Sequence, residues 1–367
     1  MRQLEQIIRQ EIAAKGPMPF ARFMKLALYH PTEGYYERDA RPIGRQGDFF
    51  TSVSVGRLFG ELLGFQLGNW LEKIPTTDCC LVEAGAHDGQ LAFDVLGYLR
   101  VYQPALLERI QYGIVEPSAR RRSWQTAALR EFSGKVRWFE SLDSLPAEGV
   151  SGIIFSNELL DALPVHRLCW DASAQRWLEW AVTTKDGSFI YSKMPVSEGS
   201  ELTGSLPLTW PELSREFLEV LPDGFTTEVS PAATAWWRRA SRALKTGHLL
   251  TIDYGLNADE FFAPERKNGT LRAYRQHHSS SDLLRNIGEQ DLTAHVNFTA
   301  LTQAGEEVGL RTAALLSQTK FLTQIAEQTW QQGAPFREWS PEDVRQFQTL
   351  THPEHLGRSF RVLIQSR

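Results

Sequence analysis

The sequence has few cysteines, and two of its three lie side by side. Cys79 and Cys80 belong to an apolar stretch, so they indicate neither a disulfide framework nor a metal site. His277, His278 and His295 also lack a cysteine or carboxylate at metal-binding spacing. We therefore expect no bound metal ion and a reducing, cytoplasmic compartment.

Long apolar runs and an excess of basic residues are absent as well. No run approaches the roughly 18 residues that a membrane-spanning helix requires. The net charge of −5 excludes an overall basic field for nucleic acid. Residues 1–16 are amphipathic without an evident cleavage site, which predicts a structural helix rather than a targeting peptide. With 42% hydrophobic and 23% charged residues, the 367-residue chain has the composition of a globular protein with a large core.

Residues 79–89, CCLVEAGAHDG, predict a buried strand, a glycine-containing turn and the start of a helix. Gly85 allows a sharp turn, since it has no Cβ and tolerates a positive φ, and Gly89 allows the helix to pack closely. The stretch lacks the middle glycine of Gly-x-Gly-x-x-Gly and the Gly-Lys-Ser/Thr of a P-loop. By itself, it fits either a nucleotide-binding turn or a plain strand-to-helix connection.

A second strand that ends in a carboxylate favours the interpretation as a nucleotide-binding turn. Residues 111–116 end in Glu116, 33 residues after Glu83. A carboxylate at this place suits a ribose, whose two hydroxyls can donate hydrogen bonds to it. Two such units predict an adenosine-bearing cofactor, and the alternative is a pair of solvated glutamates at strand ends.

Strands and helices alternate from residue 79 to residue 253, which predicts a mostly parallel α/β sheet. After the first helix, we expect helices over residues 19–29, 55–73, 91–100, 119–132, 232–244, 298–308 and 321–329. Ser54 is expected to cap the helix over residues 55–73. The expected strands are 79–83, 112–116, 135–139, 152–156, 248–253, 311–316 and 360–364. Tryptophan-rich hairpin strands around Asp186-Gly187 predict a small β insertion. Residues 257–297 are expected to be mostly loop.

Several strings of the chain resemble the MidA-like family, whose mitochondrial members assist respiratory complex I assembly as arginine methyltransferases. The resemblance covers nearly the whole chain. Its landmarks are residues 47–52 (GDFFTS), 83–89 (EAGAHDG), 157–165 (NELLDALPV), 253–255 (DYG), 269–276 (GTLRAYRQ) and 291–296 (DLTAHV). The resemblance implies a class I methyltransferase, with a Rossmann-like α/β sheet that uses S-adenosylmethionine to methylate an arginine of a protein substrate.

We expect two parts in the chain. Residues 1–75 form an N-terminal helical segment with a loop that covers the cofactor, and residues 76–367 form the methyltransferase domain, with the insertion at about 166–226. The residues expected to bind the cofactor are Asp48, Thr51, Ser52, Glu83, Gly85, Ala86, Gly89, Glu116 and Asn157. The alternative for Asp48, Thr51 and Ser52 is that they are turn and cap residues.

For an arginine substrate, carboxylates would orient the guanidinium group through paired hydrogen bonds. Glu158 and Asp161 follow the fourth strand of the sheet, at its ligand-binding edge. They are three residues apart and share a face if a helical turn forms there. We expect both, together with Asn157, at the catalytic centre; the alternative is that they cap the following helix and hold its turn. The residues expected to line the substrate cleft are Tyr274, Arg275, His277 and His295, each of which could instead be structural.

Two departures from the family lie by the expected cofactor site. His87 stands where the family has its middle glycine, and Val53-Ser54 stands where it usually has Pro-Glu. We expect the loop to remain competent, with the His87 ring directed away from the sulfonium and with weaker binding than in a His87→Gly variant. One alternative is an inactive methyltransferase-fold protein that acts as an assembly factor or binding module. A dehydrogenase is disfavoured by the glycine pattern.

Overall fold

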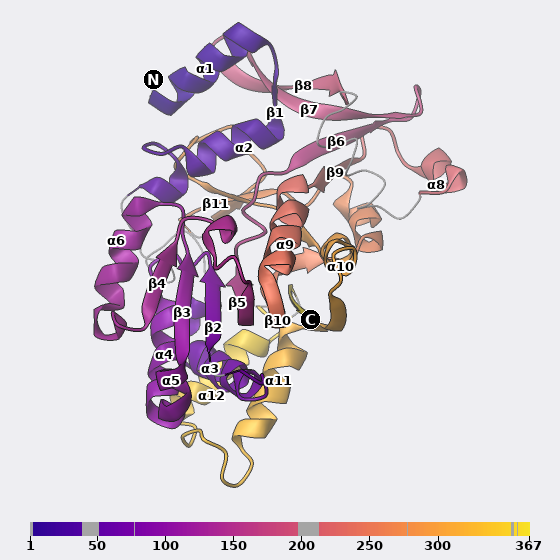
Figure 1. Cartoon of the computed structure of the whole chain (residues 1–367). Coiled ribbons are helices and arrows are strands. Elements are labelled where there is room, and N and C mark those ends of the chain that lie inside the picture. The colour runs from indigo at the N-terminus through magenta and orange to yellow at the C-terminus, as the bar shows by residue number, and fades with distance from the viewer. Residues whose placement is uncertain are drawn as a thin grey trace.

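The computed structural model describes residues 3–38, 51–76, 78–196, 213–276, 278–353, 356–357 and 359–367 (Figure 1). Two amphipathic helices open the chain. The first buries Leu4, Ile8 and Ile12 at helical spacing, and Gly16, with φ of 85°, follows its end. The N-terminal elements are α1 (Gln3–Lys15), β1 (Met18–Pro19), α2 (Phe20–Tyr29) and a 3-10 helix (Tyr35–Glu37).

A twisted sheet forms the centre of the molecule, in the order β15-β16-β10-β5-β2-β3-β4. Neighbouring strands from β10 to β4 pair in parallel, whereas β16 is antiparallel to both β10 and β15. The predicted Rossmann-like α/β fold is thereby confirmed. The strands are β2 (Cys79–Ala84), β3 (Ile110–Val115), β4 (Val136–Phe139), β5 (Val150–Asn157), β10 (Leu244–Leu256), β15 (Arg311–Ser317) and β16 (Phe360–Ser366), with the short β14 (Val296–Asn297) beside the end of β10.

Helices cover both faces of this sheet (Figure 1). Successive residues of β2 point to opposite faces of the sheet. Leu81 packs against α3, α4 and α11 on one face, and Val82 packs against α9 and α10 on the other. None of the described helices is long and apolar enough to cross a membrane. The helices are α3 (Leu58–Leu71), α4 (Gln90–Tyr102), α5 (Pro104–Arg109), α6 (Ala119–Ala128), α9 (Pro231–Ala243), α10 (Phe298–Glu306), α11 (Gln318–Thr329) and α12 (Pro341–Thr351).

The helix predicted over 55–73 begins later than expected. A 3-10 helix (Val53–Val55) precedes Gly56, whose φ of 149° interrupts the helical path, and α3 starts at Leu58. Ser54 does not cap α3. Its hydroxyl donates to the carbonyl of Thr51 at 2.8 Å, so it closes a local turn instead.

A second sheet joins the insertion to the N-terminal segment. The order is β1-β7-β6-β9, and β8 pairs with the other edge of β7. Asp186 and Gly187 link β7 and β8 with φ of 48° and 76°, the two positive values of a tight hairpin turn, as predicted. Its elements are β6 (His166–Asp171), β7 (Arg176–Lys185), β8 (Ser188–Pro195) and β9 (Thr226–Val229), with α8 (Arg215–Val220) between the last two.

Residues 257–297 are mostly loop, as predicted, but they also contain short strands that the sequence did not indicate. Three short strands form a third sheet, β12-β11-β13, under the N-terminal helices. Ala273 and Leu292 pair across it and pack against apolar residues of α1 and α2, although the strands are too short and polar to show alternation. The elements are 3-10 helices at Asp259–Phe262 and Pro264–Arg266, β11 (Arg272–Arg275), β12 (His278–Ser280) and β13 (Asp291–Thr293).

Candidate functional site

The loop after β2 turns through three residues with positive φ. Gly85, His87 and Gly89 have φ of 79°, 45° and 91°. A Cβ on Gly85 would lie 2.9 Å from Cδ1 of Leu159, so a larger residue would require Leu159 to shift as well as a positive φ. Gly89 is the N-cap of α4, and its N–H donates to the carbonyl of Ala86 at 2.7 Å. The loop therefore keeps a tight course with a histidine at its middle position.

Glu83 lies near the end of β2 and is 2% exposed. The hydroxyl of Tyr112, on the neighbouring strand β3, donates to its Oε2 at 2.6 Å. Burial raises the pKa of Glu83 to about 7, against the opposing effect of this hydrogen bond. The side chain is thus fixed within the sheet, which excludes the alternative of a solvated glutamate.

Glu116, directly after β3, is equally buried. Its Oε1 accepts hydrogen bonds from the N–H of Ser118 at 2.9 Å and from Nε of Arg121 at 3.1 Å. Burial raises its pKa, while the Arg121 guanidinium opposes the shift. Arg121 also lies 3.6 Å from the carboxylate of Glu37, so the N-terminal segment reaches this strand end. Glu116 is therefore an oriented carboxylate rather than a solvated one.

Thr51 and Ser52 are both buried, directly before the 3-10 helix Val53–Val55. The N–H of Ser52 donates to Oε1 of Glu158 at 2.9 Å, and its hydroxyl donates to Oε1 of Gln318 at 3.1 Å. Thr51 and Ser54 exchange hydrogen bonds between backbone and side chain. These residues thus join the turn after β5. Asp48 and His277, also candidates from the sequence, lie outside the described residues.

The turn after β5 carries the three residues expected at the catalytic centre. Glu158 has φ of 52°, a region that residues other than glycine seldom occupy, and its Oε1 also accepts from Nδ2 of Asn157 at 3.1 Å. Burial raises the pKa of Glu158 to about 8. Burial likewise raises the pKa of Asp161 well above its usual value, and the nearby carboxyl groups of Asp253 and Asp291 add to the rise. No regular helix follows this turn, which removes the alternative that the two acids cap one.

Two further carboxyl groups, those of Asp253 and Asp291, were not among the site residues predicted from the sequence. Asp253, in β10, accepts hydrogen bonds through Oδ2 from the N–H groups of Leu159 and Leu160 at 3.2 and 2.8 Å. Its pKa is raised to about 7, chiefly by burial. Asp291 accepts a hydrogen bond from the hydroxyl of Tyr36 at 2.8 Å. The position of Asp253 near the carboxyl end of a parallel strand is a signal that could have found it.

We call Glu158, Asp161, Asp253 and Asp291 the carboxyl cluster. In the part of the chain that the structure describes, no basic side chain forms an ion pair with the first three. Beside them, Oδ1 of Asn157 is buried and without a hydrogen-bond partner, in a residue that is 9% exposed. Within the described ranges, no group of histidine, cysteine and acidic residues is arranged to hold a metal ion. The cluster therefore offers acceptors, and its chemistry suits a cation with several N–H donors.

The structure separates two of the expected substrate residues. Tyr274 pairs with Asp291 across β11 and β13, and its pKa is raised by burial and by the charges of Asp161 and Asp291. The neighbouring Arg275 is instead directed to Glu289, with 3.5 Å between Nη2 and Oε2, and is 39% exposed. Tyr274 therefore lies by the carboxyl cluster, whereas Arg275 belongs to a peripheral ion pair.

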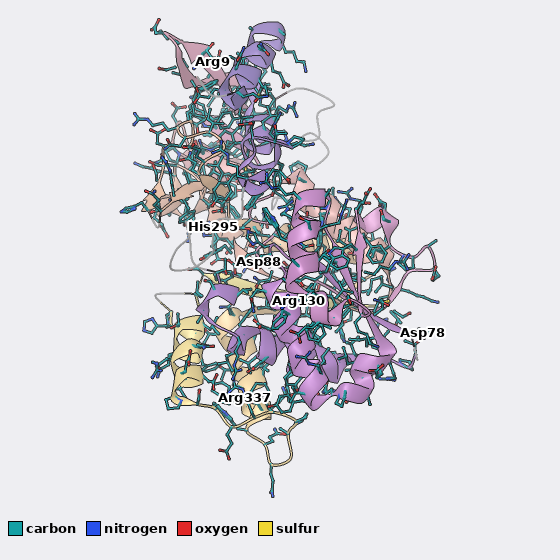
Figure 2. The ribbon with its side chains drawn as sticks, turned by 90° about the vertical axis from the view of Figure 1, so that its left-hand side faces the viewer. Arg9, Asp78, Asp88, Arg130, His295 and Arg337 are labelled. Atoms are coloured by element: carbon teal, nitrogen blue, oxygen red, sulfur yellow. The ribbon has the colours of Figure 1, made fainter. Side chains whose placement is uncertain are left out.

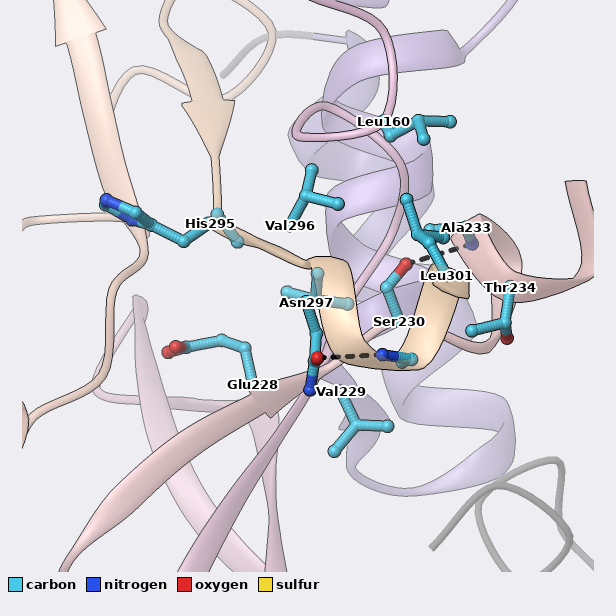
Figure 3. A pocket seen from close by; sticks show the side chains of 13 residues that line it. Leu160, Glu228, Val229, Ser230, Ala233, Thr234, His295, Val296, Asn297 and Leu301 are labelled. Atoms are coloured by element: carbon cyan, nitrogen blue, oxygen red, sulfur yellow. Dashed lines mark hydrogen bonds between the residues drawn. The ribbon is translucent and has the colours of Figure 1, made fainter. Parts of the chain in front are cut away.

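His295 lies near the middle of the molecule, close to the level of Asp88 (Figure 2). Burial lowers its pKa to about 4, so the imidazole is neutral at physiological pH, and its ring centre is 6.5 Å from that of Tyr254. It contributes to the lining of a pocket between β9, α9 and α10, but its ring points away from Leu160 and Leu301 (Figure 3). Because that pocket is mostly apolar and lacks the carboxyl cluster, we do not assign the reaction to it.

The residues at the ends of β2 and β3 fit an adenosyl cofactor. The three positive φ values of the loop 85–89 give the tight turn between strand and helix that such a cofactor needs, and Gly85 lets this turn pack against Leu159. The Glu116 carboxylate is held in one orientation at the end of β3, and the unpartnered Oδ1 of Asn157 lies at the end of β5. This donor and acceptor pattern is consistent with the cofactor that the sequence implied.

Comparison with known proteins supports this interpretation. Residues 62–316 match the model of a family described as "Putative S-adenosyl-L-methionine-dependent methyltransferase". The mitochondrial protein arginine methyltransferase NDUFAF7 homolog of Drosophila melanogaster is 30% identical, over 98% of this chain and 84% of the relative. The human mitochondrial protein arginine methyltransferase NDUFAF7 is 27% identical, over 81% of this chain and 67% of its own. A crystal structure of a "likely methyl transferase" from Burkholderia thailandensis, bound to S-adenosyl-homocysteine, has a TM-score of 0.82 and 30% identity, and the match covers 99% of this chain and 92% of that one.

These relatives correct one expectation. The low cysteine content led us to expect a cytoplasmic protein, but the curated relatives from Caenorhabditis elegans, Drosophila melanogaster and human are all named as mitochondrial. Cysteine content reports the redox state of a compartment, and it does not distinguish between reducing compartments.

The family model spans more than half of the chain, and the structural match to the protein with bound S-adenosyl-homocysteine spans nearly all of it. Together with the glycine turn after β2 and the buried Glu116 after β3, these matches show that the chain belongs to the family of S-adenosyl-L-methionine-dependent methyltransferases.

Proposed function

We propose that this enzyme methylates an arginine side chain of a protein substrate at the carboxyl cluster. The observation that carries the proposal is the burial of Glu158, Asp161 and Asp253 without a basic partner among the described residues. Buried carboxylates are costly unless they are paired, so the cluster favours a cationic ligand. A guanidinium group brings both the charge and five N–H donors. The names of the curated relatives support arginine as the acceptor.

The cofactor is assigned to the loop 85–89 and the strand end at Glu116. S-adenosylmethionine supplies an electrophilic methyl group bonded to a sulfonium. Glu116 accepts hydrogen bonds from the ribose, and its orientation is held by Ser118 and Arg121. Asn157, with its unpartnered oxygen, faces the shared edge of the sheet from β5. Glu83 supports the loop from within the sheet through its hydrogen bond with Tyr112.

Glu158 and Asp161 hold the acceptor. Glu158 is fixed in direction by the N–H of Ser52 and by Nδ2 of Asn157, so little side-chain freedom is lost when a guanidinium group binds. The positive charge of the guanidinium favours the ionised forms of both carboxyl groups and lowers their pKa values. Paired hydrogen bonds to a planar guanidinium would leave one nitrogen directed toward the methyl donor.

Methyl transfer to a guanidinium nitrogen requires that a proton leave that nitrogen. Once the bound guanidinium has shifted Glu158 and Asp161 to their ionised forms, either carboxylate can accept that proton as the methyl group leaves the sulfonium, and burial of Glu158 favours its protonated form afterwards. The cluster therefore provides a local acceptor for the proton, and burial of the surrounding residues keeps bulk water from competing.

The proposal is tested by supplying tritiated S-adenosylmethionine to the purified enzyme with an extract of cells that lack its gene. After acid hydrolysis of the proteins, we expect the label in methylarginine. Asp161→Asn should abolish this label. The matched control is Asp143→Asn, since Asp143 is 72% exposed and bridges to Arg239 away from the cluster. Label confined to another amino acid or to small molecules would contradict the proposal, whereas methylarginine formation excludes the alternative of an inactive assembly factor.

A further inference from the structure

Gln125 is a buried amide that connects the two loops assigned to the cofactor. It lies in α6 and is 0% exposed. Its Nε2 donates to the carbonyl of His87 at 3.0 Å and to Oε2 of Glu116 at 3.3 Å. Its Oε1 accepts a hydrogen bond from the indole N–H of Trp138 at 3.0 Å. One side chain thus joins the loop after β2, the loop after β3 and strand β4.

The orientation of this amide follows from its partners. The indole nitrogen of Trp138 can only donate, and the carbonyl of His87 can only accept. Oε1 must therefore face Trp138, and Nε2 must face His87 and Glu116. All three contacts depend on an amide of this length, because a carboxylate lacks the donors and an apolar side chain lacks both donors and acceptor.

The contact to His87 meets a strained part of the loop. His87 has φ of 45°, whereas residues with a Cβ seldom adopt positive φ without a compensating contact. The hydrogen bond from Gln125 fixes the carbonyl of this same residue. α6 also packs close to the loop, since a Cβ on Gly89 would lie 3.5 Å from Cα of Gln125. The amide is therefore placed to hold the histidine in a conformation that glycine would adopt readily.

We propose that Gln125 is a positioning residue for S-adenosylmethionine binding, which ties His87 to Glu116 and so permits a histidine at the middle position of the loop. The inference rests on the assignment of the cofactor to this loop and to Glu116 in the proposed function. Without the amide, His87 returns to a negative φ, and both the loop and the Glu116 carboxylate lose their common support.

The protein contains a matched control for the loss of such an amide. Gln365, in β16, is also 0% exposed and also accepts an indole N–H, that of Trp237, at 2.8 Å. Its Nε2 donates to the carbonyl of Thr302 and the hydroxyl of Thr312, each at 2.9 Å. Gln365→Met thus removes the same number of hydrogen bonds as Gln125→Met, in a part of the sheet away from the cofactor loops.

The experiment measures the affinity for S-adenosylhomocysteine by calorimetric titration, with thermal unfolding in parallel. Gln125→Met is expected to weaken binding about tenfold, the scale of losing one hydrogen bond to a charged group. Gln365→Met should lower the melting temperature about as much as Gln125→Met does, but it should leave the affinity for S-adenosylhomocysteine unchanged. In a His87→Gly background, the effect of Gln125→Met on affinity should shrink, because glycine needs no tether to keep a positive φ.

Gln125→Glu is a second variant of nearly the same size, for the case that Gln125→Met does not fold. Its new carboxylate would face that of Glu116, so its loss of affinity relative to the parent should grow as the pH rises.

Each outcome decides the proposal. An unchanged affinity in a folded Gln125 variant would overturn it and leave the proposed function intact. If Gln125→Met weakens binding equally in the parent and in the His87→Gly background, the proposal that Gln125 acts through His87 is overturned. If the parent protein does not bind S-adenosylhomocysteine at all, the cofactor assignment itself fails, together with this inference.

Discussion

Glu158 Oε1 accepts a hydrogen bond from the backbone N–H of Ser52 at 2.9 Å, across 106 residues of sequence. Ser52 is in turn held by Gln318, whose Nε2 donates to the carbonyl of Leu350. The direction of the glutamate at the centre of the proposed acceptor site is therefore set by the N-terminal segment and by α11, and not by its own turn alone. The positive φ of Glu158 also indicates that surrounding contacts hold this residue, because such backbone strain persists only where contacts enforce it.

Glu158→Gln is expected to reduce methyl transfer about 10- to 100-fold, which corresponds to losing a charged hydrogen bond to the acceptor. The amide oxygen can still accept from Ser52, so the affinity for S-adenosylhomocysteine should change little. The rate of methylarginine formation and a calorimetric titration measure the two effects. Glu179→Gln is the control, since Glu179 is also buried but pairs with His166 in the insertion sheet. Equal activity of Glu158→Gln and the parent would remove Glu158 from the proposed site.

Glu83→Gln should change how stability depends on pH. Burial raises the pKa of Glu83 from its usual 4.5 to about 7, so the folded protein keeps a proton that the unfolded chain loses between these values. The contribution of Glu83 to the free energy of unfolding therefore falls as the pH rises through this window, by at most about 1.4 kcal/mol per pH unit. Above about pH 7, the folded protein has also lost this proton, so the contribution of Glu83 to the free energy of unfolding no longer changes with pH.

The glutamine does not titrate, so the stability of Glu83→Gln relative to the parent should increase from pH 4.5 to pH 7. Urea unfolding at several pH values measures this difference. Glu108→Gln is a control in which the replaced carboxylate is 80% exposed, and it should show little trend. A difference between Glu83→Gln and the parent that is independent of pH would contradict the raised pKa.

His87→Gly should raise the free energy of unfolding by about 1 kcal/mol, because glycine adopts the observed φ of 45° without the clash of a Cβ. We also expect it to bind S-adenosylhomocysteine more tightly than the parent protein. Gln175→Gly is a control with nearly the same φ, 48°, in an exposed turn of the insertion, and it should affect stability but not binding.

A less stable His87→Gly variant would refute the strain argument. If the parent does not bind while His87→Gly does, the chain has lost its cofactor site through this substitution, and the alternative of a binding module gains support.

The central sheet could be predicted because its strands are short apolar runs separated by helical periodicity. The run CCLVEA in β2 and the run GIIFS within β5 are mostly apolar and are buried on both faces, as strands covered on both sides must be. The strand ends then placed Glu83, Glu116 and Glu158 at one edge of the sheet without any knowledge of tertiary contacts.

Features that depend on contacts between distant segments were not accessible in this way. Asp291 joins the carboxyl cluster only because β13 pairs with β11 beneath the N-terminal helices, where Tyr36 donates to it. The role of Gln125 depends on the conformation of His87, and single-sequence patterns do not reveal backbone φ at residues other than glycine. Ser54 had the residue type of a helix cap, but the positive φ of Gly56 delays the helix beyond its reach.

The most direct test of the account is a calorimetric titration of the protein with S-adenosylhomocysteine, alongside Glu116→Ala and with NAD as a negative ligand. We expect saturable binding to the parent protein, no binding of NAD, and a loss of about 1–3 kcal/mol in Glu116→Ala, because the ribose loses its charged acceptor. Glu140→Ala, which removes a carboxylate that is 79% exposed and pairs with Arg122, should bind like the parent. An affinity of Glu116→Ala equal to that of the parent, in a folded variant, would contradict the assignment of the cofactor to this strand end, and the absence of any binding to the parent would contradict the account as a whole.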